Sequence, residues 1–498
     1  IATLGAARRD SVRCVWVTVS LLLLACSESA GSGQSDSLTT DLAAADMAPS
    51  VGVTKVAPER GSAAGGITIV VRGEGFAPPI AVYFGDSKAK LKAWRPDAVS
   101  VISPPGIAGL VDVTVEAAGE SVVVAEGFEY EKLALHYGVA GTEVFPAETV
   151  TGRQVLALDI EGDGDLDILQ AVMGGANRLW VNNGQGAFAD QSSLRLPHVF
   201  HKTVALAAAD CNGDGYLDLI EGNELEPNVL LLGSAAGLFV AAEDGVIGEG
   251  PVATRALVVL DANGDEQRDL LIVVGGVDAH QEFYLNSVEG GLSASLDSAP
   301  GTWQFAARDA VAFDADGDGD TDLFFVGELA PSRLLLNDGD GVFGLASADA
   351  LPAMDGLGEL AGAAFDLEGD GDLDLILGRV TGDLILVNDG TGRFQERTEL
   401  HLGGLPGSHR RMAAADMDLD GSTDLVLVEA KYGGLHLYRN DAAGHLFDYS
   451  GKLEAMNGAL DFAHVAVGDL DGDMAPDIVA SGGGSPTYLM LSSVPSAD

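Results

Sequence analysis

Short apolar and β-branched runs recur along the chain from residue 51 onwards, separated by Gly, Pro, Asn and Asp. Such runs predict short β-strands joined by turns. No segment carries the 3.6-residue period of a sustained amphipathic helix. The pattern of apolar and polar positions therefore predicts an all-β protein.

The segment 51–131 has the strand spacing of a β-sandwich. Its apolar runs lie at 67–71, 81–84, 99–102 and 111–115, with turn residues between them. The turn residues and the closing aromatic pair resemble those of the IPT/TIG family. They include Gly65-Gly66, Gly73-Glu74-Gly75-Phe76, Pro104-Pro105-Gly106 and Phe128-Glu129-Tyr130. The resemblance implies an immunoglobulin-like domain over 51–131.

The remainder of the chain, residues 133–498, is a repeat. The nonapeptide Asp-x-[Asp/Asn/Glu]-x-Asp-x-x-x-Asp occurs seven times, starting at Asp159, Asp210, Asp261, Asp314, Asp366, Asp416 and Asp469. Each nonapeptide lies between two apolar runs, and a third run, a tight turn and a short fourth run follow. Four strands in each of seven units of about 50 residues predict a seven-bladed β-propeller.

The strand count also predicts how the ring closes. The last unit has only three strand-like runs, whereas a surplus run precedes the first unit. We therefore expect residues 133–146 to complete the last blade. Closure of this kind removes the free edges of a ring of sheets.

The nonapeptides are candidate calcium sites. Ca²⁺ takes six to eight oxygen ligands, and each repeat offers side-chain oxygens at positions 1, 3, 5 and 9 and a backbone carbonyl at position 7. Positions 10–12 are mostly apolar, so the loop leads into a strand and differs from an EF-hand. The pattern resembles the FG-GAP/VCBS repeats of bacterial surface proteins and of integrin α-chain propellers. By position, this resemblance implies the ligands Asp159, Glu161, Asp163, Asp165, Asp167; Asp210, Asn212, Asp214, Tyr216, Asp218; Asp261, Asn263, Asp265, Gln267, Asp269; Asp314, Asp316, Asp318, Asp320, Asp322; Asp366, Glu368, Asp370, Asp372, Asp374; Asp416, Asp418, Asp420, Ser422, Asp424; and Asp469, Asp471, Asp473, Ala475, Asp477.

Some loops depart from the pattern. Position 6, usually Gly, is Glu266 in the third loop and Met474 in the seventh, and Arg268 also lies in the third loop. Up to seven Ca²⁺ are expected, with the sites that start at Asp261 and Asp469 the weakest. Glu161 and Glu368 are longer than the usual Asp or Asn. One alternative is that the loops are polar turns without metal, and another is that calcium is purely structural.

The N-terminal residues predict export and a lipid anchor. Arg8, Arg9 and Arg13 precede an apolar run that is too short to span a bilayer, which is typical of a signal peptide over 1–25. The run ends in Leu23-Leu24-Ala25-Cys26, which resembles a bacterial lipobox with Cys26 as the lipidated residue. Residues 26–50 are rich in Ser, Gly and Ala and predict a flexible linker. The expected location is the bacterial envelope, at the outer membrane or cell surface; a plain secretory signal is the alternative.

Charge restricts the class of partner. The chain carries 75 Asp and Glu against 27 Lys and Arg, a formal charge of −48, and no broad basic surface for nucleic acid is expected. With 47% hydrophobic residues it is not a disordered polyanion. The seven nonapeptides hold 30 of the 75 acidic residues, so much of the charge belongs to the candidate metal loops.

Basic residues share one register. Four repeats have an arginine six residues before the first loop aspartate: Arg153, Arg255, Arg308 and Arg410. In a propeller this position begins the innermost strand, at the end away from the calcium loops. The four arginines are candidates for an anion or acidic-glycan site, because Arg binds carboxylates bidentately. The alternative is that they pair with carboxylates of neighbouring blades.

Catalytic motifs are scarce. The sequence has neither His-Glu-x-x-His nor Gly-x-Ser-x-Gly, His198 and His201 lack an evident partner set, and Cys211 occupies a non-ligand position of the second loop. We therefore expect a calcium-binding surface lipoprotein without enzymatic activity. The expected function is adhesion or binding to extracellular protein or polysaccharide, with membrane attachment through Cys26 only. The alternatives are an enzyme or accessory subunit acting on extracellular polysaccharide, and a passive envelope scaffold.

Overall fold

The computed structural model describes most of the chain after residue 50. It covers residues 51–493 except 64, 105, 132–134, 142–143, 147–148, 244–246, 249, 277–278, 288–290, 296–302, 329, 355–357, 402–406, 432, 442 and 454–460. The expected signal peptide, Cys26 and the linker up to residue 50 lie outside the described residues.

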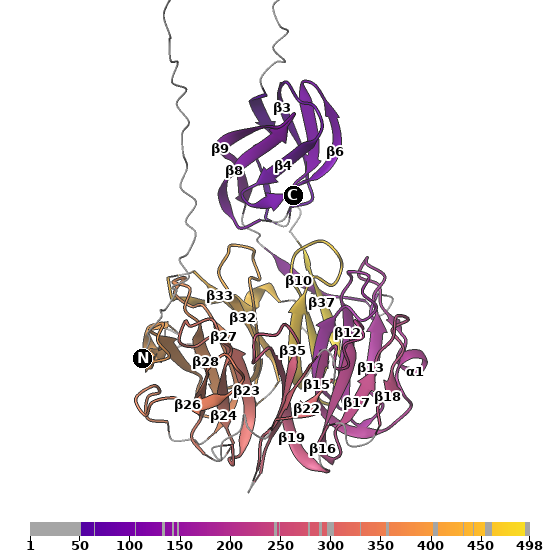
Figure 1. Ribbon diagram of the computed structural model, residues 1–498, viewed down its shortest axis with the longest axis vertical. Helices are drawn as coiled ribbons and strands as arrows, with labels where there is room; N and C mark the ends of the chain where they lie inside the picture. The colour runs from indigo at the N-terminus through magenta and orange to yellow at the C-terminus, as the bar shows by residue number, and fades with distance from the viewer. Residues whose placement is uncertain are drawn as a thin grey trace, which may run out of the picture. The chain divides into compact units, whose positions relative to one another are not determined.

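The segment that begins at residue 51 folds into a β-sandwich (Figure 1). Its two sheets have the strand orders β1-β3-β7-β6 and β2-β9-β8-β4-β5. Side chains alternate between core and surface, so that Ile69 and Val71 of β3 are both buried. Phe128 packs edge-to-face against Phe84 and Tyr130 in the core. The strands are β1 (Gly52–Ala57), β2 (Arg60–Ser62), β3 (Thr68–Glu74), β4 (Ile80–Phe84), β5 (Ser87–Lys88), β6 (Lys90–Arg95), β7 (Ala98–Ile102), β8 (Gly109–Ala117) and β9 (Glu120–Glu131).

The repeat region folds into seven four-stranded antiparallel blades, as predicted. Six blades use four consecutive strands each: β11 (Gly152–Leu158), β12 (Asp167–Gly175), β13 (Arg178–Val181), β14 (Ala189–Asp190); β15 (His201–Ala209), β16 (Asp218–Glu226), β17 (Val229–Leu232), β18 (Val240–Ala241); β19 (Val252–Leu260), β20 (Asp269–Val274), β21 (Glu282–Leu285), β22 (Ser293–Ala294); β23 (Ala307–Phe313), β24 (Asp322–Gly327), β25 (Arg333–Asn337), β26 (Phe343–Leu345); β27 (Glu359–Phe365), β28 (Asp374–Arg379), β29 (Leu384–Asn388), β30 (Phe394–Glu396); and β31 (His409–Ala415), β32 (Asp424–Glu429), β33 (Leu435–Asn440), β34 (Leu446–Asp448).

The seventh blade takes its outer strand from the start of the region. β35 (Phe462–Gly468), β36 (Asp477–Gly482) and β37 (Tyr488–Ser493) are joined by β10 (His136–Val139), which pairs antiparallel with β37. Figure 1 shows β10 in purple beside yellow β37, although the two strands are far apart in the sequence. The last blade therefore has no unpaired edge at β37.

The first strands of the blades form a closed ring. β11 contacts β15, each first strand in turn contacts the next, and β35 contacts β11 again. The hydrophobic core lies between adjacent blades, as where Phe283 of the third blade meets Trp303 and Phe343 beside the fourth. Second strands such as β20, β24 and β36 are buried along their whole length because neighbouring blades cover both faces. Their continuous apolar runs follow from this burial.

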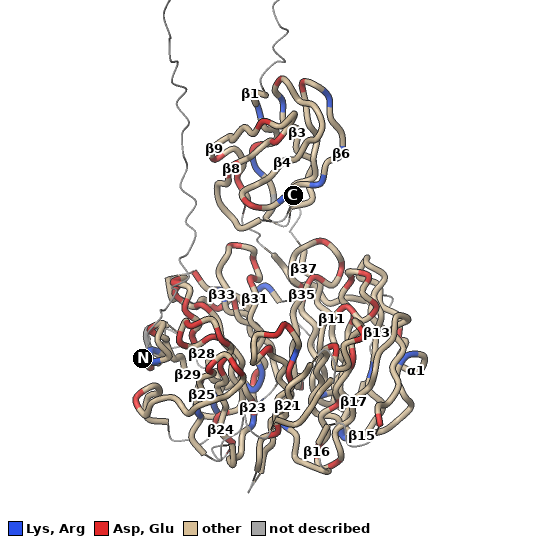
Figure 2. The backbone as a smooth tube through the Cα atoms, viewed as in Figure 1, with Lys and Arg blue, Asp and Glu red and all other residues tan. Residues whose placement is uncertain are grey.

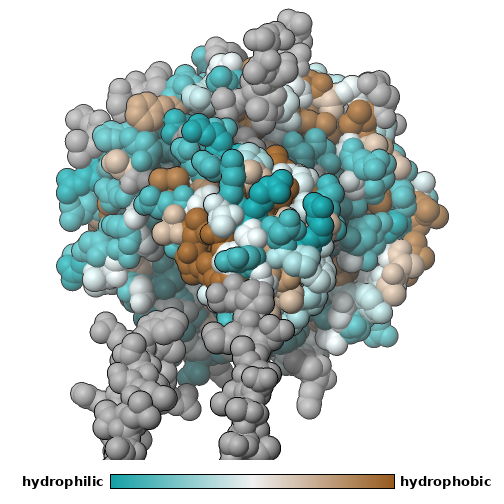
Figure 3. Space-filling model, turned by 90° about the horizontal axis from the view of Figure 1, so that it is seen from above, coloured by the Kyte–Doolittle hydropathy of each residue, from teal (hydrophilic) through white to brown (hydrophobic). Residues whose placement is uncertain are grey.

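Helices contribute little to the described residues. α1 (Ser192–Arg195) and α2 (Thr398–His401) are single turns, and η1 (Ser450–Lys452) is one 3-10 turn. None of the helices in the described part of the chain has the length and apolarity required to cross a membrane. The face in Figure 3 mixes hydrophilic residues with small hydrophobic groups.

Candidate functional site

Each nonapeptide connects the first strand of a blade to the second, and the aspartate at position 1 folds the loop. In the fourth loop Asp314 Oδ1 accepts the Gly317 N–H at 2.8 Å, and its Oδ2 accepts the Gly319 N–H at 3.0 Å. These donors, at positions 4 and 6, both have positive φ. Non-glycine residues adopt the same conformation in other loops, with φ of 66° at Glu266 and 71° at Met474. The sequence pattern singled out position 6 but missed position 4.

The aspartate at position 9 joins the loop to the third strand. Asp322 Oδ2 accepts the Ala315 N–H at 2.8 Å, and Oδ1 accepts the Asn337 N–H at 2.7 Å. The corresponding pair of hydrogen bonds recurs in the other six loops. All seven position-9 carboxylates are buried and begin a second strand. Together with the bonds at position 1, these hydrogen bonds define the shape of the loop.

Burial of these carboxylates opposes their ionisation. It raises the pKa of Asp322 to about 6, of Asp374 to about 7 and of Asp424 to about 8, and neighbouring carboxylates add to the effect. Each carboxylate also accepts two backbone N–H bonds, and these bonds lower its pKa. A divalent cation beside such a group favours its charged form.

Three loops bring three carboxylates together. The oxygens of positions 1, 3 and 9 lie within 4.8 Å of one another in the fourth, sixth and seventh loops, namely Asp314, Asp316 and Asp322; Asp416, Asp418 and Asp424; and Asp469, Asp471 and Asp477. Clustered carboxylate oxygens suit Ca²⁺, which prefers hard oxygen ligands. The seventh loop belongs to this group although Met474 replaces glycine, and its expected rank among the weakest sites stays a prediction.

Positions 5 and 7 form a small turn in every loop. The position-5 carboxylate accepts the backbone N–H of position 7, for example Asp318 from Asp320 at 3.0 Å and Asp473 from Ala475 at 2.9 Å. In the second and third loops Asn212 and Asn263 occupy position 3, and their side-chain amides donate to Asp214 and Asp265. These two loops offer an amide oxygen where the three triads offer a carboxylate.

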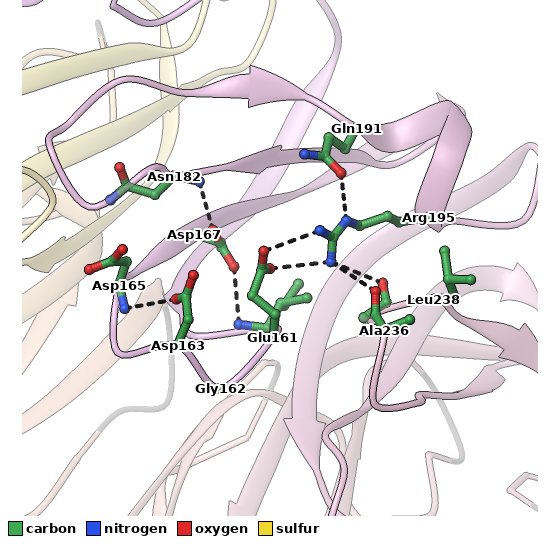
Figure 4. A network of polar contacts seen from close by, with 12 residues as sticks. Glu161, Gly162, Asp163, Asp165, Asp167, Asn182, Gln191, Arg195, Ala236 and Leu238 are labelled. Carbon is green, nitrogen blue, oxygen red and sulfur yellow. Dashed lines mark hydrogen bonds and ion pairs between the residues drawn. The ribbon is translucent and has the colours of Figure 1, made fainter.

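The two loops with glutamate at position 3 contain a partner that was not predicted. Both carboxylate oxygens of Glu161 contact Arg195, at 3.1 and 3.3 Å, as Figure 4 shows. Arg195 comes from α1 and also donates to the carbonyls of Ala236 and Gly237 in the next blade. In the fifth loop Glu368 lies 3.8 Å from His401 of α2. His401 also contacts the Gly444 carbonyl of the following blade.

Glu161 and Glu368, the two longer side chains at position 3, therefore each have a basic partner. Neither belongs to a three-carboxylate cluster among the described residues. The sixth loop has a related feature, because Arg439 Nε lies 2.7 Å from Asp418 and Nη2 lies 3.2 Å from Asp420. The sequence does contain the basic residues Arg195, His401 and Arg439, which could have indicated such pairs. It does not show which loop each of them contacts.

Asparagines at the end of the third strand connect neighbouring blades. Asn337 donates its side-chain N–H to the Ala262 carbonyl of the preceding loop at 2.7 Å, and Asn388 donates to the Ala315 carbonyl at 2.8 Å. Asn182, Asn286 and Asn440 make equivalent bonds to the preceding loops. Each of these metal-type loops is thus tied to the following blade.

The four arginines that share a register lie together in one cavity of about 540 Å³. All seven equivalent positions line it: Arg153, Val204, Arg255, Arg308, Leu360, Arg410 and Ala463. They begin the ring of first strands, whereas the loops follow the ends of those strands. At about 3.3 Å per residue, the cavity and the loops lie roughly 20 Å apart along the strands.

Carboxylates accompany most of these arginines. Arg255 lies 3.2 Å from Glu224 and 3.1 Å from Glu328, and Arg308 lies 3.8 Å from the same Glu328. Arg410 lies 2.6 Å from Asp461. The alternative to ligand binding, that these arginines pair with carboxylates, therefore holds for Arg255, Arg308 and Arg410. Arg153 differs, since its guanidinium contacts the sulfur of Met173 at 2.8 Å.

The residues considered for catalysis have structural surroundings. Burial raises the pKa of the Cys211 thiol to about 12, so the thiol is protonated at neutral pH. His201 lies 3.0 Å from Glu221, and this contact raises the pKa of the histidine. His198 enters none of the ion pairs found among the described residues.

The β-sandwich, the closed ring of blades and the acidic loops define the class of protein. It consists of an immunoglobulin-like domain followed by a β-propeller whose acidic loops resemble calcium-binding loops. The chain carries an IPT/TIG domain, matched at residues 51–130, and FG-GAP-like repeats, matched at 147–221, 314–377, 366–427 and 416–480. The third loop, which contains Glu266 and Arg268, lies outside these segments. Comparison with curated proteins gives no match.

Several solved structures are similar over most of this chain. One is a lectin from Agrocybe aegerita that recognises non-reducing terminal N-acetylglucosamine, with 18% identity, coverage of 84% of this chain and 97% of that chain, and a TM-score of 0.45. A protein of unknown function from Bacteroides thetaiotaomicron has 12% identity, coverage of 90% and 99%, and a TM-score of 0.47. An auxiliary nutrient binding protein from Bacteroides ovatus has 12% identity, coverage of 89% and 98%, and a TM-score of 0.38.

Proposed function

We propose that this protein is a calcium-stabilised, non-enzymatic binding protein of the bacterial cell surface, attached through a lipidated Cys26. Its ligand is an extracellular polysaccharide or protein. The observation that carries the proposal is the cavity at the ring of first strands, where four blades contribute an arginine in the same register. A cavity of about 540 Å³ has the size of ligand sites in proteins.

Calcium has a structural role in this proposal. The triads of the fourth, sixth and seventh loops would hold Ca²⁺ through positions 1, 3 and 9, while the remaining loops would complete a set of up to seven sites. Bound calcium neutralises carboxylates that are buried close together, and this stabilises the loops. Because Asn337 and Asn388 connect loops to neighbouring blades, the effect extends to the joints of the ring.

Thermal unfolding tests the role of calcium. We expect millimolar calcium to raise the melting temperature of the chelated protein by several degrees, and Asp322→Asn with Asp477→Asn to reduce this rise. Mg²⁺ at the same concentration serves as the control for charge screening. An unchanged melting temperature on addition of calcium would show that the loops are polar turns.

Retention on glycan arrays and cell-wall fractions, with calcium and with EDTA, tests the binding function. Calcium-dependent retention without a released product supports the proposal. Release of shorter saccharides would establish the enzyme alternative. Failure to retain any glycan, wall fraction or surface protein would leave the passive scaffold as the function.

A further inference from the structure

The cavity at the ring of first strands has more basic than acidic residues, although the protein as a whole is strongly acidic. Acidic residues outnumber basic ones 75 to 27 in the whole chain, whereas the described residues that line the cavity include five arginines but only two acids, Glu224 and Asp309. Figure 2 shows how few blue segments the chain has among the red ones. The fifth arginine, Arg411, follows the shared register by one position and lies 3.5 Å from Asp309.

Intramolecular pairs neutralise these arginines unequally. Arg255 has two carboxylates within 3.2 Å, one of which it shares with Arg308. Among the described residues no carboxylate lies within 4.0 Å of Arg153, and its contact with Met173 is to a weak acceptor. The partner of Arg410, Asp461, has a side chain that is 60% exposed, so solvent screens this pair. Arg153 is therefore the least neutralised cation of the cavity, and Arg410 has one carboxylate partner, which is largely exposed.

These two arginines flank the seventh blade. Arg410 begins β31 of the sixth blade, Arg153 begins β11 of the first, and Ala463 holds the register position between them. Both contact the seventh blade directly: Arg410 donates to the Phe462 carbonyl, and the Arg153 carbonyl accepts from the Ser481 hydroxyl. The small side chain of Ala463 leaves space in this sector.

The remaining positions supply apolar surface and no competing charge. Val204 and Leu360 hold the register in the second and fifth blades. His464 also lines the cavity, and burial beside Arg411 lowers its pKa to about 3, so it is neutral at physiological pH. The cavity thus combines an arginine pair with apolar patches, which are the two features needed to bind a molecule with both a carboxylate and a non-polar face.

We propose that Arg153 and Arg410 bind the carboxylate of an acidic sugar unit, such as a uronate, whose ring packs against Ala463 and Leu360. The inference rests on the binding function proposed above and names its ligand class. A pyranose ring presents C–H groups beside its carboxylate, which matches the cavity lining. An acidic peptide would bring backbone amides into the cavity as well, and those groups lose water on entry and need partners.

Calorimetry with the full chain in millimolar calcium tests this site, using tri-galacturonate as the probe. We expect saturable binding that is at least tenfold tighter than that of the methyl-esterified trisaccharide, because esterification removes the charge. Arg153→Gln and Arg410→Gln should each weaken binding about tenfold or more. Arg393→Gln is the matched control, since Arg393 is exposed, pairs with Asp349 and lies away from the cavity, and it should leave the affinity unchanged.

Three results would overturn the proposal. They are equal affinity for the acid and its ester, unchanged affinity in the Arg153→Gln, Arg410→Gln double variant, and tighter binding of tri-glutamate than of tri-galacturonate. Unchanged melting temperatures of the variants establish that they fold. If the double variant still shows calcium-dependent retention on the glycan arrays, the binding function stands and this site is wrong; if the wild type is not retained, the binding function itself fails.

Discussion

The aspartates of the nonapeptides perform two tasks that their spacing alone does not separate. Positions 1 and 9 accept backbone N–H groups in the loop and the third strand, as Asp314 and Asp322 do. Position 3 varies among Asp, Asn and Glu, and its side chain determines how each loop resembles or departs from a metal site. In several loops it also accepts a backbone N–H, from position 5, as Asn212, Asn263 and Asp471 do. The residue at position 3 is therefore the one to read first when the loops are compared.

Arg195 supplies the clearest test at this scale. It forms a two-point contact with Glu161, and the two side chains are only 13% and 20% exposed. We expect Arg195→Gln to lower the free energy of unfolding by about 1–3 kcal/mol, because it leaves a partly buried carboxylate without its charged partner. Chemical denaturation measures the change.

The double variant Arg195→Gln, Glu161→Gln is the control, and it should recover part of the loss. A second readout is the number of calcium ions bound, measured by native mass spectrometry. With Arg195 removed, Glu161 becomes available as a ligand of the first loop, and the mean number of ions bound at limiting calcium should rise. Unchanged stability and stoichiometry would both contradict this role of Arg195.

Pairs of this kind mark the limit of what could be predicted from the sequence. The spacing of the nonapeptides identified every loop aspartate, because the ligands of one loop are neighbours in the chain. Arg195 lies in a single helical turn with no periodic signal, and it reaches a loop 34 positions away. Arg439 and His401 reach their loops in the same way. Contacts between segments depend on how strands pair, which the local pattern does not show.

At the scale of the loop, backbone conformation explains the distribution of glycine. Positions 4 and 6 have positive φ in all seven loops, although Leu419, Glu266 and Met474 occupy three of these positions. Side chains with a Cβ atom are strained in this region by about 1–2 kcal/mol per residue. The departures seen in the sequence are therefore tolerated without a change of loop conformation.

A pair of opposite substitutions measures this strain. Glu266→Gly should raise the free energy of unfolding by about 0.5 kcal/mol, because relief of strain exceeds the greater freedom of glycine in the unfolded chain. Gly319→Ala should lower it by about 1 kcal/mol, since φ is 95° there and an added Cβ would meet no atom within 4 Å. Glu266→Gln controls for the charge. Urea denaturation with EDTA checks both values, and equal stability of all variants would contradict the explanation.

Strand-level features were predictable where burial imposes a pattern. Continuous apolar runs after each nonapeptide became the buried second strands, of which β24 is typical. The fourth strands are short, and β14, β18 and β22 have only two residues each, so their runs carried a weaker signal. The one-turn helices α1 and α2 had no recognisable pattern in the sequence.

At the scale of the whole molecule, Tyr137 anchors β10, the strand that completes the last blade. Tyr137 is buried and donates its hydroxyl to the Met417 carbonyl at 3.0 Å, while its strand pairs with β37. Tyr137→Ala should lower the free energy of unfolding by about 3–5 kcal/mol, because it leaves a large cavity at the closure. Tyr137→Phe keeps the ring and should cost about 1 kcal/mol.

Unfolding and solution scattering together check the role of Tyr137. The alanine variant is expected to show a larger radius of gyration and self-association through the exposed edge of β37. The phenylalanine variant should keep the size of the wild type. If the alanine variant is as compact and monomeric as the wild type, β10 is not needed for closure.

The pairing of β10 with β37 also sets an order in time. A chain is made from its N-terminus, and domains generally fold in that direction. β10 is therefore among the first strands of the propeller to emerge, but its partner is the last. Until β37 has been synthesised, β10 lacks the strand with which it pairs. In the same way, β11 lacks its contact with β35 until that strand has been made. A chain that stopped before Tyr488 would leave β10 without the strand it pairs with, and the hydrogen-bonding groups of that edge would stay unpaired.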